Sequence, residues 1–179
     1  NWKNISDGFF GSSIGAIAIA PSNENIIYVG EGENTMRGNV SEGLGGIWKS
    51  EDGGKTWKNC GLKDGRHITN ILIDPSNPSV VWAGVMGHLF GPNTERGVFK
   101  STDGGNHWFK TVCPANAITC IVQDCRAGKT NIWYAGTGEL SGSSGTATGA
   151  YYLGMGLLKS TDGGEHWSIL SATAGGSST

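Results

Sequence analysis

The chain has 179 residues and a formal net charge of −2 at pH 7, and its 31 glycines far outnumber its 5 prolines. Because lysine and arginine form no cluster, this charge argues against nucleic acid as the main partner. No apolar run approaches the roughly 18 residues of a membrane-spanning helix, so we expect no membrane span. No stretch shows a helical period and the glycines suit tight turns, so the composition favours an all-β chain.

The first residues of the chain resemble the end of a later segment. Trp2-Lys3-Asn4-Ile5 matches Trp57-Lys58-Asn59, which predicts that residues 1–6 form the outer strand of a preceding unit. An apolar strand then opens each of three units, at 14–19, 68–73 and 118–123. After a turn, a second strand rich in β-branched and aromatic residues is expected at 26–30, 80–84 and 132–136. We expect the units to span 14–60, 67–113 and 117–170, with 171–179 as a tail or linker.

Each unit continues through a glycine-rich connection of variable length, at 31–44, 85–95 and 137–154, into a third strand and a nearly constant box. The box reads S-x-D-G-G-x-x-W, and its fixed positions are Ser50, Asp52, Gly54 and Trp57, then Ser101, Asp103, Gly105 and Trp108, then Ser160, Asp162, Gly164 and Trp167. Asp-Gly-Gly is typical of hairpin turns, because Asp bonds nearby backbone N–H groups and Gly accepts positive φ. The three aspartates are therefore interpreted as turn-locking residues, since one active site does not need three copies of its acid.

Four antiparallel strands repeated about every 50 residues predict the blades of a β-propeller. The chain then holds about three blades plus one N-terminal outer strand. Since a propeller needs about four to eight blades to close, three blades require completion. We expect the rest of the ring to lie in the same polypeptide, and completion by other copies of the chain is the alternative.

The box resembles the Asp-box, or bacterial neuraminidase repeat, of a β-propeller superfamily. Segments such as Ala20-Pro-Ser-Asn and Tyr28-Val-Gly-Glu-Gly-Glu33 look most like the sortilin-like and xyloglucanase-like propellers, including many secreted bacterial proteins. This resemblance implies an extracellular, cell-surface or periplasmic location. It also implies that the box lies on the face away from the ligand site.

The variable connections define the candidate functional face, because loops that vary on a constant scaffold often carry binding groups. The blade 1–2 connection, with Asp64, Arg66 and His67, is expected to reach the same face. The predicted ligand-binding residues are Asn34, Arg37, Arg66, His88, Arg96, Tyr151 and Tyr152. The candidate catalytic carboxylates are Glu31, Glu33 and Glu139, with backbone capping and cation binding, calcium for example, as the alternatives for Glu33 and Glu139. The histidines show no metal-ligand spacing, and no cofactor is predicted.

The favoured function is a binding or interaction scaffold for a polysaccharide or a protein. The alternative is part of a glycoside hydrolase that cleaves polysaccharide with two carboxylates. The arginine cluster of a sialidase is not recognisable here, and Glu31 and Glu33 stand where xyloglucanase-like enzymes place an aspartate. The cysteines, at 60, 113, 120 and 125, form no C-x-x-C pair, so disulfides and buried free thiols both remain open.

Overall fold

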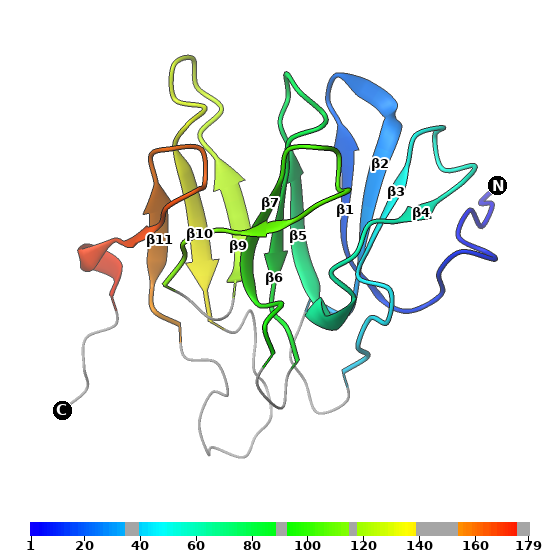
Figure 1. Cartoon of the computed structure of the whole chain (residues 1–179), viewed down its shortest axis with the longest axis horizontal. Coiled ribbons are helices and arrows are strands. Elements are labelled where there is room, and N and C mark those ends of the chain that lie inside the picture. The colour runs from blue at the N-terminus through cyan, green and yellow to red at the C-terminus, as the bar shows by residue number, and fades with distance from the viewer. Residues whose placement is uncertain (35–39, 89–92, 115–117, 139–153, 175–179) are drawn as a thin grey trace.

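A computed structural model describes residues 1–34, 40–88, 93–114, 118–138 and 154–174 of the chain. Twelve strands in these ranges form three four-stranded antiparallel sheets, which stand side by side in Figure 1. The first blade contains β1 (Ile14–Ala20), β2 (Asn23–Glu31), β3 (Ile47–Ser50) and β4 (Lys58–Asn59). The second contains β5 (Ile68–Ile73), β6 (Val81–Val85), β7 (Gly97–Ser101) and β8 (Phe109–Lys110). The third contains β9 (Ile118–Gln123), β10 (Trp133–Thr137), β11 (Leu157–Ser160) and β12 (Ser168–Ile169).

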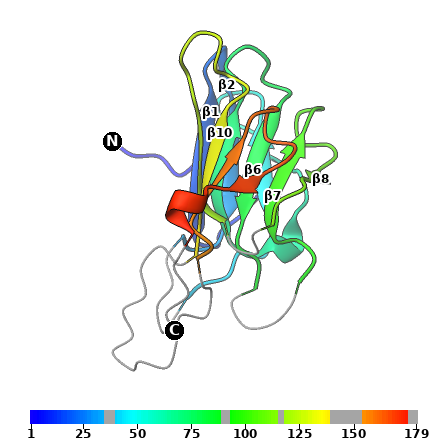
Figure 2. The same cartoon turned by 90° about the vertical axis from the view of Figure 1, so that its left-hand side faces the viewer.

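Within each sheet the strands follow one another in chain order, so each blade is a simple meander. The first strands of neighbouring blades contact each other, β1 with β5 and β5 with β9. Figure 2 shows β1 on one side of the molecule and β8 on the other. This is the architecture of a partial β-propeller, and it confirms the predicted all-β class and the four-stranded blades. Residues 1–6, predicted as an outer strand, pair with no strand of the described chain.

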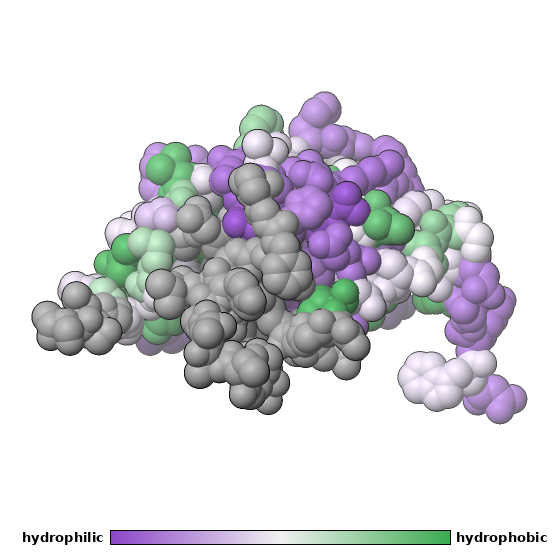
Figure 3. Space-filling view, turned by 90° about the horizontal axis from the view of Figure 1, so that it is seen from below, coloured by the Kyte–Doolittle hydropathy of each residue, from purple (hydrophilic) through white to green (hydrophobic). Residues whose placement is uncertain are grey.

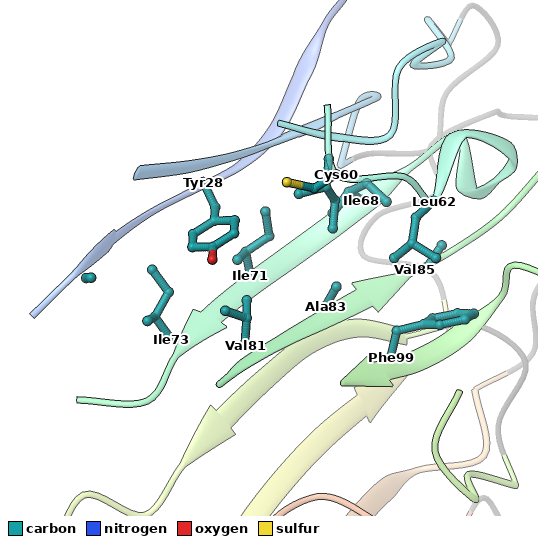
Figure 4. Packing of buried hydrophobic residues seen from close by; sticks show 12 residues of the cluster. Tyr28, Cys60, Leu62, Ile68, Ile71, Ile73, Val81, Ala83, Val85 and Phe99 are labelled. Atoms are coloured by element: carbon teal, nitrogen blue, oxygen red, sulfur yellow. The ribbon is translucent and has the colours of Figure 1, made fainter. Parts of the chain in front are cut away.

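Two apolar layers hold the blades together. The layer between blades 1 and 2 includes Tyr28, Ile68, Ile71, Val85 and Phe99, and their side chains converge in Figure 4. The layer between blades 2 and 3 includes Trp82, Ile118, Ile121, Trp133 and Leu158. Burying such side chains contributes about 1.5–3 kcal/mol each, so blade stacking is a main source of stability.

One glycine near the end of each second strand explains how closely the blades approach. A Cβ at Gly30 would lie 2.5 Å from Ile68 Cγ2 of the next blade. At Gly84 it would lie 3.2 Å from Ile118 Cγ2. A side chain at Gly30 would overlap the first strand of the following blade, and one at Gly84 would require its neighbours to shift by a few tenths of an ångström.

Two short 3₁₀ helices complete the described structure, η1 (Lys63–Gly65) in the connection between blades 1 and 2 and η2 (Ser171–Thr173) after blade 3. No helix of the described residues is long and apolar enough to cross a membrane. No disulfide joins the cysteines of the described chain, and Cys60 is the buried one, where burial raises the pKa of its thiol.

Candidate functional site

The three boxes form turns at one end of the blades, the upper end in Figure 1. In the first box the Ser50 hydroxyl donates to Asp52 Oδ1 at 2.8 Å and accepts from the Gly54 N–H at 2.8 Å. The Thr56 hydroxyl and backbone N–H also donate to Asp52, and these hydrogen bonds lower its pKa to about 2. The equivalent serine and aspartate bonds recur in the other two boxes. The geometry gives the box aspartates a turn-locking role.

The tryptophans of the first two boxes fix their turns to a neighbouring segment. The Trp57 indole N–H donates to the Ile5 carbonyl at 2.9 Å, and that of Trp108 donates to the Cys60 carbonyl at 2.8 Å. The Trp167 indole N–H donates to the Gly164 carbonyl within its own box. Phe10 packs edge-on against the Trp57 ring, with the ring centroids 5.2 Å apart.

The opposite end of the blades carries the variable connections, and Figure 3 views the molecule from this end. Hydrophilic residues gather there over the middle of the molecule. The predicted residues Arg37, Glu139, Tyr151 and Tyr152 lie outside the described residues, so their predicted roles stay predictions.

Glu31 is a buried clamp at the end of β2, with 3% of its surface exposed. Its Oε2 accepts hydrogen bonds from the Ser12 hydroxyl at 2.7 Å and from the backbone N–H groups of Leu44 and Gly45 at 2.8 and 2.7 Å. Its Oε1 accepts from the Trp48 indole N–H at 2.9 Å. Both oxygens are therefore engaged within the chain, and the carboxylate ties the connection after β2 to β3 and to the N-terminal segment. A cavity of about 470 Å³ opens beside it and is also lined by Phe9 and Phe10.

Glu33 and Asn34 begin the same connection and turn toward blade 2. The Asn34 side-chain amide donates to the Thr69 carbonyl at 3.0 Å, and the Glu33 carbonyl accepts from His67 Nδ1 at 3.0 Å. Because a carbonyl only accepts, this bond places the ring proton on Nδ1. His67 is 1% exposed, and its Nε2 has no hydrogen-bond partner among the described residues. Burial lowers the pKa of His67, which favours the neutral imidazole.

The connection between blades 1 and 2 is held in an unusual backbone conformation. Leu62 and Arg66 both have positive φ, at 52° and 56°. The Arg66 carbonyl accepts from the Gly43 N–H at 2.8 Å. A Cβ at Gly32, whose φ is 95°, would collide with that same carbonyl oxygen. The connection therefore packs directly on the loop after β2, and the sequence expectation that both reach one face agrees with this geometry.

His88 joins three segments at this end. Its Nε2 donates to Asp64 Oδ1 at 2.9 Å, and its Nδ1 lies 3.7 Å from Glu42 Oε1. The hydrogen bond from His88 lowers the pKa of Asp64. Arg96 supports the loop after β6 by donating from Nε to the Met86 carbonyl at 2.8 Å and from its terminal nitrogen to the His88 carbonyl. Predicted residues Arg66, His88 and Arg96 are thus brought to one place, together with Asp64 and Glu42, which we call the junction cluster.

The junction cluster is partly open to solvent. The side chains of Asp64 and Glu42 are 50% and 37% exposed, and those of His88 and Arg66 are 27% exposed. Asn93 completes it by donating from its amide to the Asp64 carbonyl. We did not single out Asn93 from the sequence, although the Gly91-Pro92-Asn93 turn pattern is a signal that would have drawn attention to it. Among the described residues, no group of three or more His, Cys, Asp and Glu side chains is placed to hold a metal ion.

None of the known protein-family models matches the chain. In sequence it is similar to two curated xyloglucanases, at 24% identity over 201 residues to that of Hypocrea jecorina and at 24% over 176 residues to that of Paenibacillus sp. These alignments cover 98% and 89% of this chain, but only 23% and 16% of the two relatives. The chain therefore spans less than a quarter of the length of these relatives.

Solved structures resemble the chain in fold. An ancestral GH74 enzyme superposes with a TM-score of 0.57 at 23% identity, over 88% of this chain and 18% of that one. YCF48 from Cyanidioschyzon merolae gives 0.53 at 16% identity, over 93% of this chain and 39% of that one. The GH74 xyloglucanase of Xanthomonas campestris gives 0.51 at 16% identity, over 91% and 30%. At these identities the structural likeness supports the propeller architecture, and the chain is a section of a β-propeller with xyloglucanases among its relatives in sequence.

Proposed function

We propose that the junction cluster binds a polysaccharide and that the chain is a ligand-binding section of an exported β-propeller. The observation that carries this proposal is the convergence of polar side chains from three separate connections on His88. The scaffold on which they converge is built by the blades themselves, so the cluster is held in place before any ligand arrives. Preorganisation of this kind lowers the entropic cost of binding.

The most exposed groups of the cluster point to the chemistry of the ligand. Asp64 and Glu42 are carboxylates, which only accept hydrogen bonds when ionised. The hydrogen bond from His88 keeps Asp64 ionised by lowering its pKa. Acceptors of this kind suit a ligand rich in hydroxyl donors, and a polysaccharide has such donors at every residue. The names of the curated relatives, which designate enzymes acting on xyloglucan, favour a plant-type glucan as the first ligand to test.

The direct test is the binding of xyloglucan oligosaccharides to the polypeptide that carries this chain in its natural length. Asp64→Asn keeps the shape of the side chain and removes its charge, and we expect binding about tenfold weaker by calorimetry. Glu24→Gln is the matched control, because Glu24 is an exposed carboxylate at the start of β2. Unchanged affinity in an Asp64→Asn, Glu42→Gln double variant would refute the proposal.

A second candidate function is glycoside hydrolysis, and the names of the relatives in sequence favour it. Asp64 and Glu42 stand at opposite nitrogens of the His88 imidazole. Glycosidases commonly need two carboxylates about 5–9.5 Å apart with the sugar between them, whereas here the imidazole fills that position. The release of reducing ends from xyloglucan separates the two functions. Hydrolysis that is lost in Asp64→Asn while binding persists would favour a catalytic role over simple binding.

A further inference from the structure

Blades 1 and 2 each present the same row of side chains to the blade that follows them. Directly paired residues of neighbouring antiparallel strands lie on one face of a sheet. The row consists of an aliphatic residue on the first strand, an aromatic residue on the second and the repeat lysine on the third, namely Ala18, Tyr28 and Lys49 in blade 1 and Leu72, Trp82 and Lys100 in blade 2. The lysine Nζ lies 5.6 Å from the Tyr28 ring centroid in blade 1 and 5.3 Å from the Trp82 ring in blade 2. Both aromatic residues are buried against the next blade.

Blade 3 carries the same row, and no other blade of the described chain packs against it. Val122, Tyr134 and Lys159 are paired across β9, β10 and β11. Lys159 Nζ lies 5.8 Å from the Tyr134 ring centroid, so the lysine and the ring are arranged as in the covered blades. Val122 is 56% exposed, whereas its counterparts Ala18 and Leu72 are half-buried. This open face is therefore built for contact with a neighbouring blade, and large exposed apolar surfaces of this kind mark interaction sites.

The repeat lysine of blade 1, Lys49, pairs with Glu51 of its own box at 2.7 Å. The second and third boxes have threonine at that position, and the repeat lysine of blade 2 reaches the next blade instead. Lys100 of blade 2 donates to Glu165, the sixth residue of the third box, at 2.9 Å. The sixth residue of the second box is Asn106, which accepts from Lys58 of blade 1 at 2.9 Å. The sixth position thus faces the lysines of the preceding blade. The side-chain ammonium of Lys159 has no hydrogen bond or ion pair with another described residue.

A second copy of this chain fits that open face poorly for two reasons. The sixth residue of the first box is Lys55, which would meet Lys159 with a like charge. The outer strand of a second copy would also need a position on blade 1 that is already occupied. The Ile5 carbonyl accepts the hydrogen bond from the Trp57 indole there.

Ile5 occupies the position on blade 1 that Cys60 occupies on blade 2. A Cβ at Gly54 would lie 2.8 Å from Ile5 Cδ1, and a Cβ at Gly105 would lie 3.3 Å from the Cys60 side chain. Cys60 follows the outer strand β4 of the preceding blade and accepts the Trp108 indole bond. Since Ile5 already has this position on blade 1, the outer strand of a second copy would have to displace it.

We propose that the open face of blade 3 packs against a further Asp-box blade of different sequence, carried by the same polypeptide, with Asp or Glu at the sixth position of its box. The acidic residue would meet Lys159 as Glu165 meets Lys100. The blade would place β-branched or aliphatic residues against Val122 and Tyr134, as Ile121 does on blade 2. This inference concerns assembly of the ring and does not depend on the ligand proposed above.

Carbodiimide coupling tests it, because this reagent joins an amine to a carboxylate that already contacts it. The natural-length polypeptide is coupled, digested and mapped by mass spectrometry, with the Lys100–Glu165 link as the internal reference. We expect Lys159 to be linked to an acidic residue of a box that lies outside residues 1–179. In Lys159→Arg, which keeps the charge but lacks a reactive amine, that link should disappear while Lys100–Glu165 remains.

Two outcomes would overturn the inference. Lys159 could stay unlinked while the Lys100–Glu165 link forms normally, which would show that no carboxylate faces it. Lys159 could instead be linked to residues 1–179 of another copy, with a solution mass that is a multiple of the chain. That second result would make the ring a self-assembly and would leave the ligand proposal untouched.

Discussion

Replacing Glu31 by alanine should destabilise the chain severely, because this buried carboxylate has four hydrogen-bond donors. Glu31→Ala leaves the Ser12 hydroxyl, two loop N–H groups and the Trp48 indole N–H without their acceptor. Hydrogen bonds to charged groups contribute about 1.5–3 kcal/mol each, but the loop donors lie near the surface and recover part of this from water. We therefore expect a loss of about 3 to 5 kcal/mol in the free energy of unfolding, which is at the upper end for a single substitution.

Urea denaturation followed by tryptophan fluorescence measures this loss, and hydrogen exchange of the Leu44 and Gly45 amides reports the clamp locally. Glu31→Gln should cost less, because its amide oxygen replaces one carboxylate oxygen while its NH₂ group opposes the indole donor. Glu24→Ala, an exposed glutamate on the same strand, is the control and should change stability by less than about 0.5 kcal/mol. If Glu31→Ala unfolds like Glu24→Ala and both amides keep their protection, the clamp described here is wrong.

Three further substitutions test separate features of the structure. Gly32→Ala should lower the free energy of unfolding, measured by urea denaturation, by at least about 2 kcal/mol more than Gly128→Ala does. Both glycines have positive φ, but only a side chain at Gly32 would collide with the Arg66 carbonyl. Equal losses would contradict the packing of the two loops. Asp52→Asn should weaken the fall of the melting temperature at acid pH. The folded pKa of Asp52 is about 2, so its carboxylate contributes stability that is present above the unfolded pKa near 4 and is lost as pH falls toward 2. The same fall in both proteins would argue against the box hydrogen bonds. The unsubstituted chain should lose stability as pH falls below about 6.5, because burial lowers the pKa of His67 and only the unfolded chain then takes up the proton. His67→Gln should not show this loss. The same dependence of melting temperature on pH in both proteins would argue against a neutral buried imidazole.

The repeats made the architecture predictable from the sequence. The box and the apolar segments before it recur in order, so the three blades and nearly all strand positions followed from pattern alone. The second strand of blade 3 was expected at 132–136 and is found at Trp133–Thr137. Such patterns work because strand periodicity and turn chemistry depend on residues close together in the chain.

The candidate site was less predictable because its contacts join distant residues. The sequence indicated that Asp64 and His88 reach one face, but not that His88 would stand between Asp64 and Glu42. The Glu31 carboxylate accepts from four donors, which come from the N-terminal segment, from the loop that follows β2, and from β3. No local sequence motif predicts this arrangement. Pairings of this kind depend on how neighbouring blades stack, and one sequence carries no local signal for them.

The box turns have a consequence for how such chains fold and diversify. Their hydrogen bonds connect residues only two to four positions apart, from Ser50 to Asp52 and from Asp52 to Thr56. Closing loops of this length costs little chain entropy, so these turns can form early, before the long-range contacts between blades. A turn that satisfies its own polar groups keeps its shape wherever it is copied. Duplication can therefore lengthen the array one blade at a time, while the connections at the other end are left to vary in length.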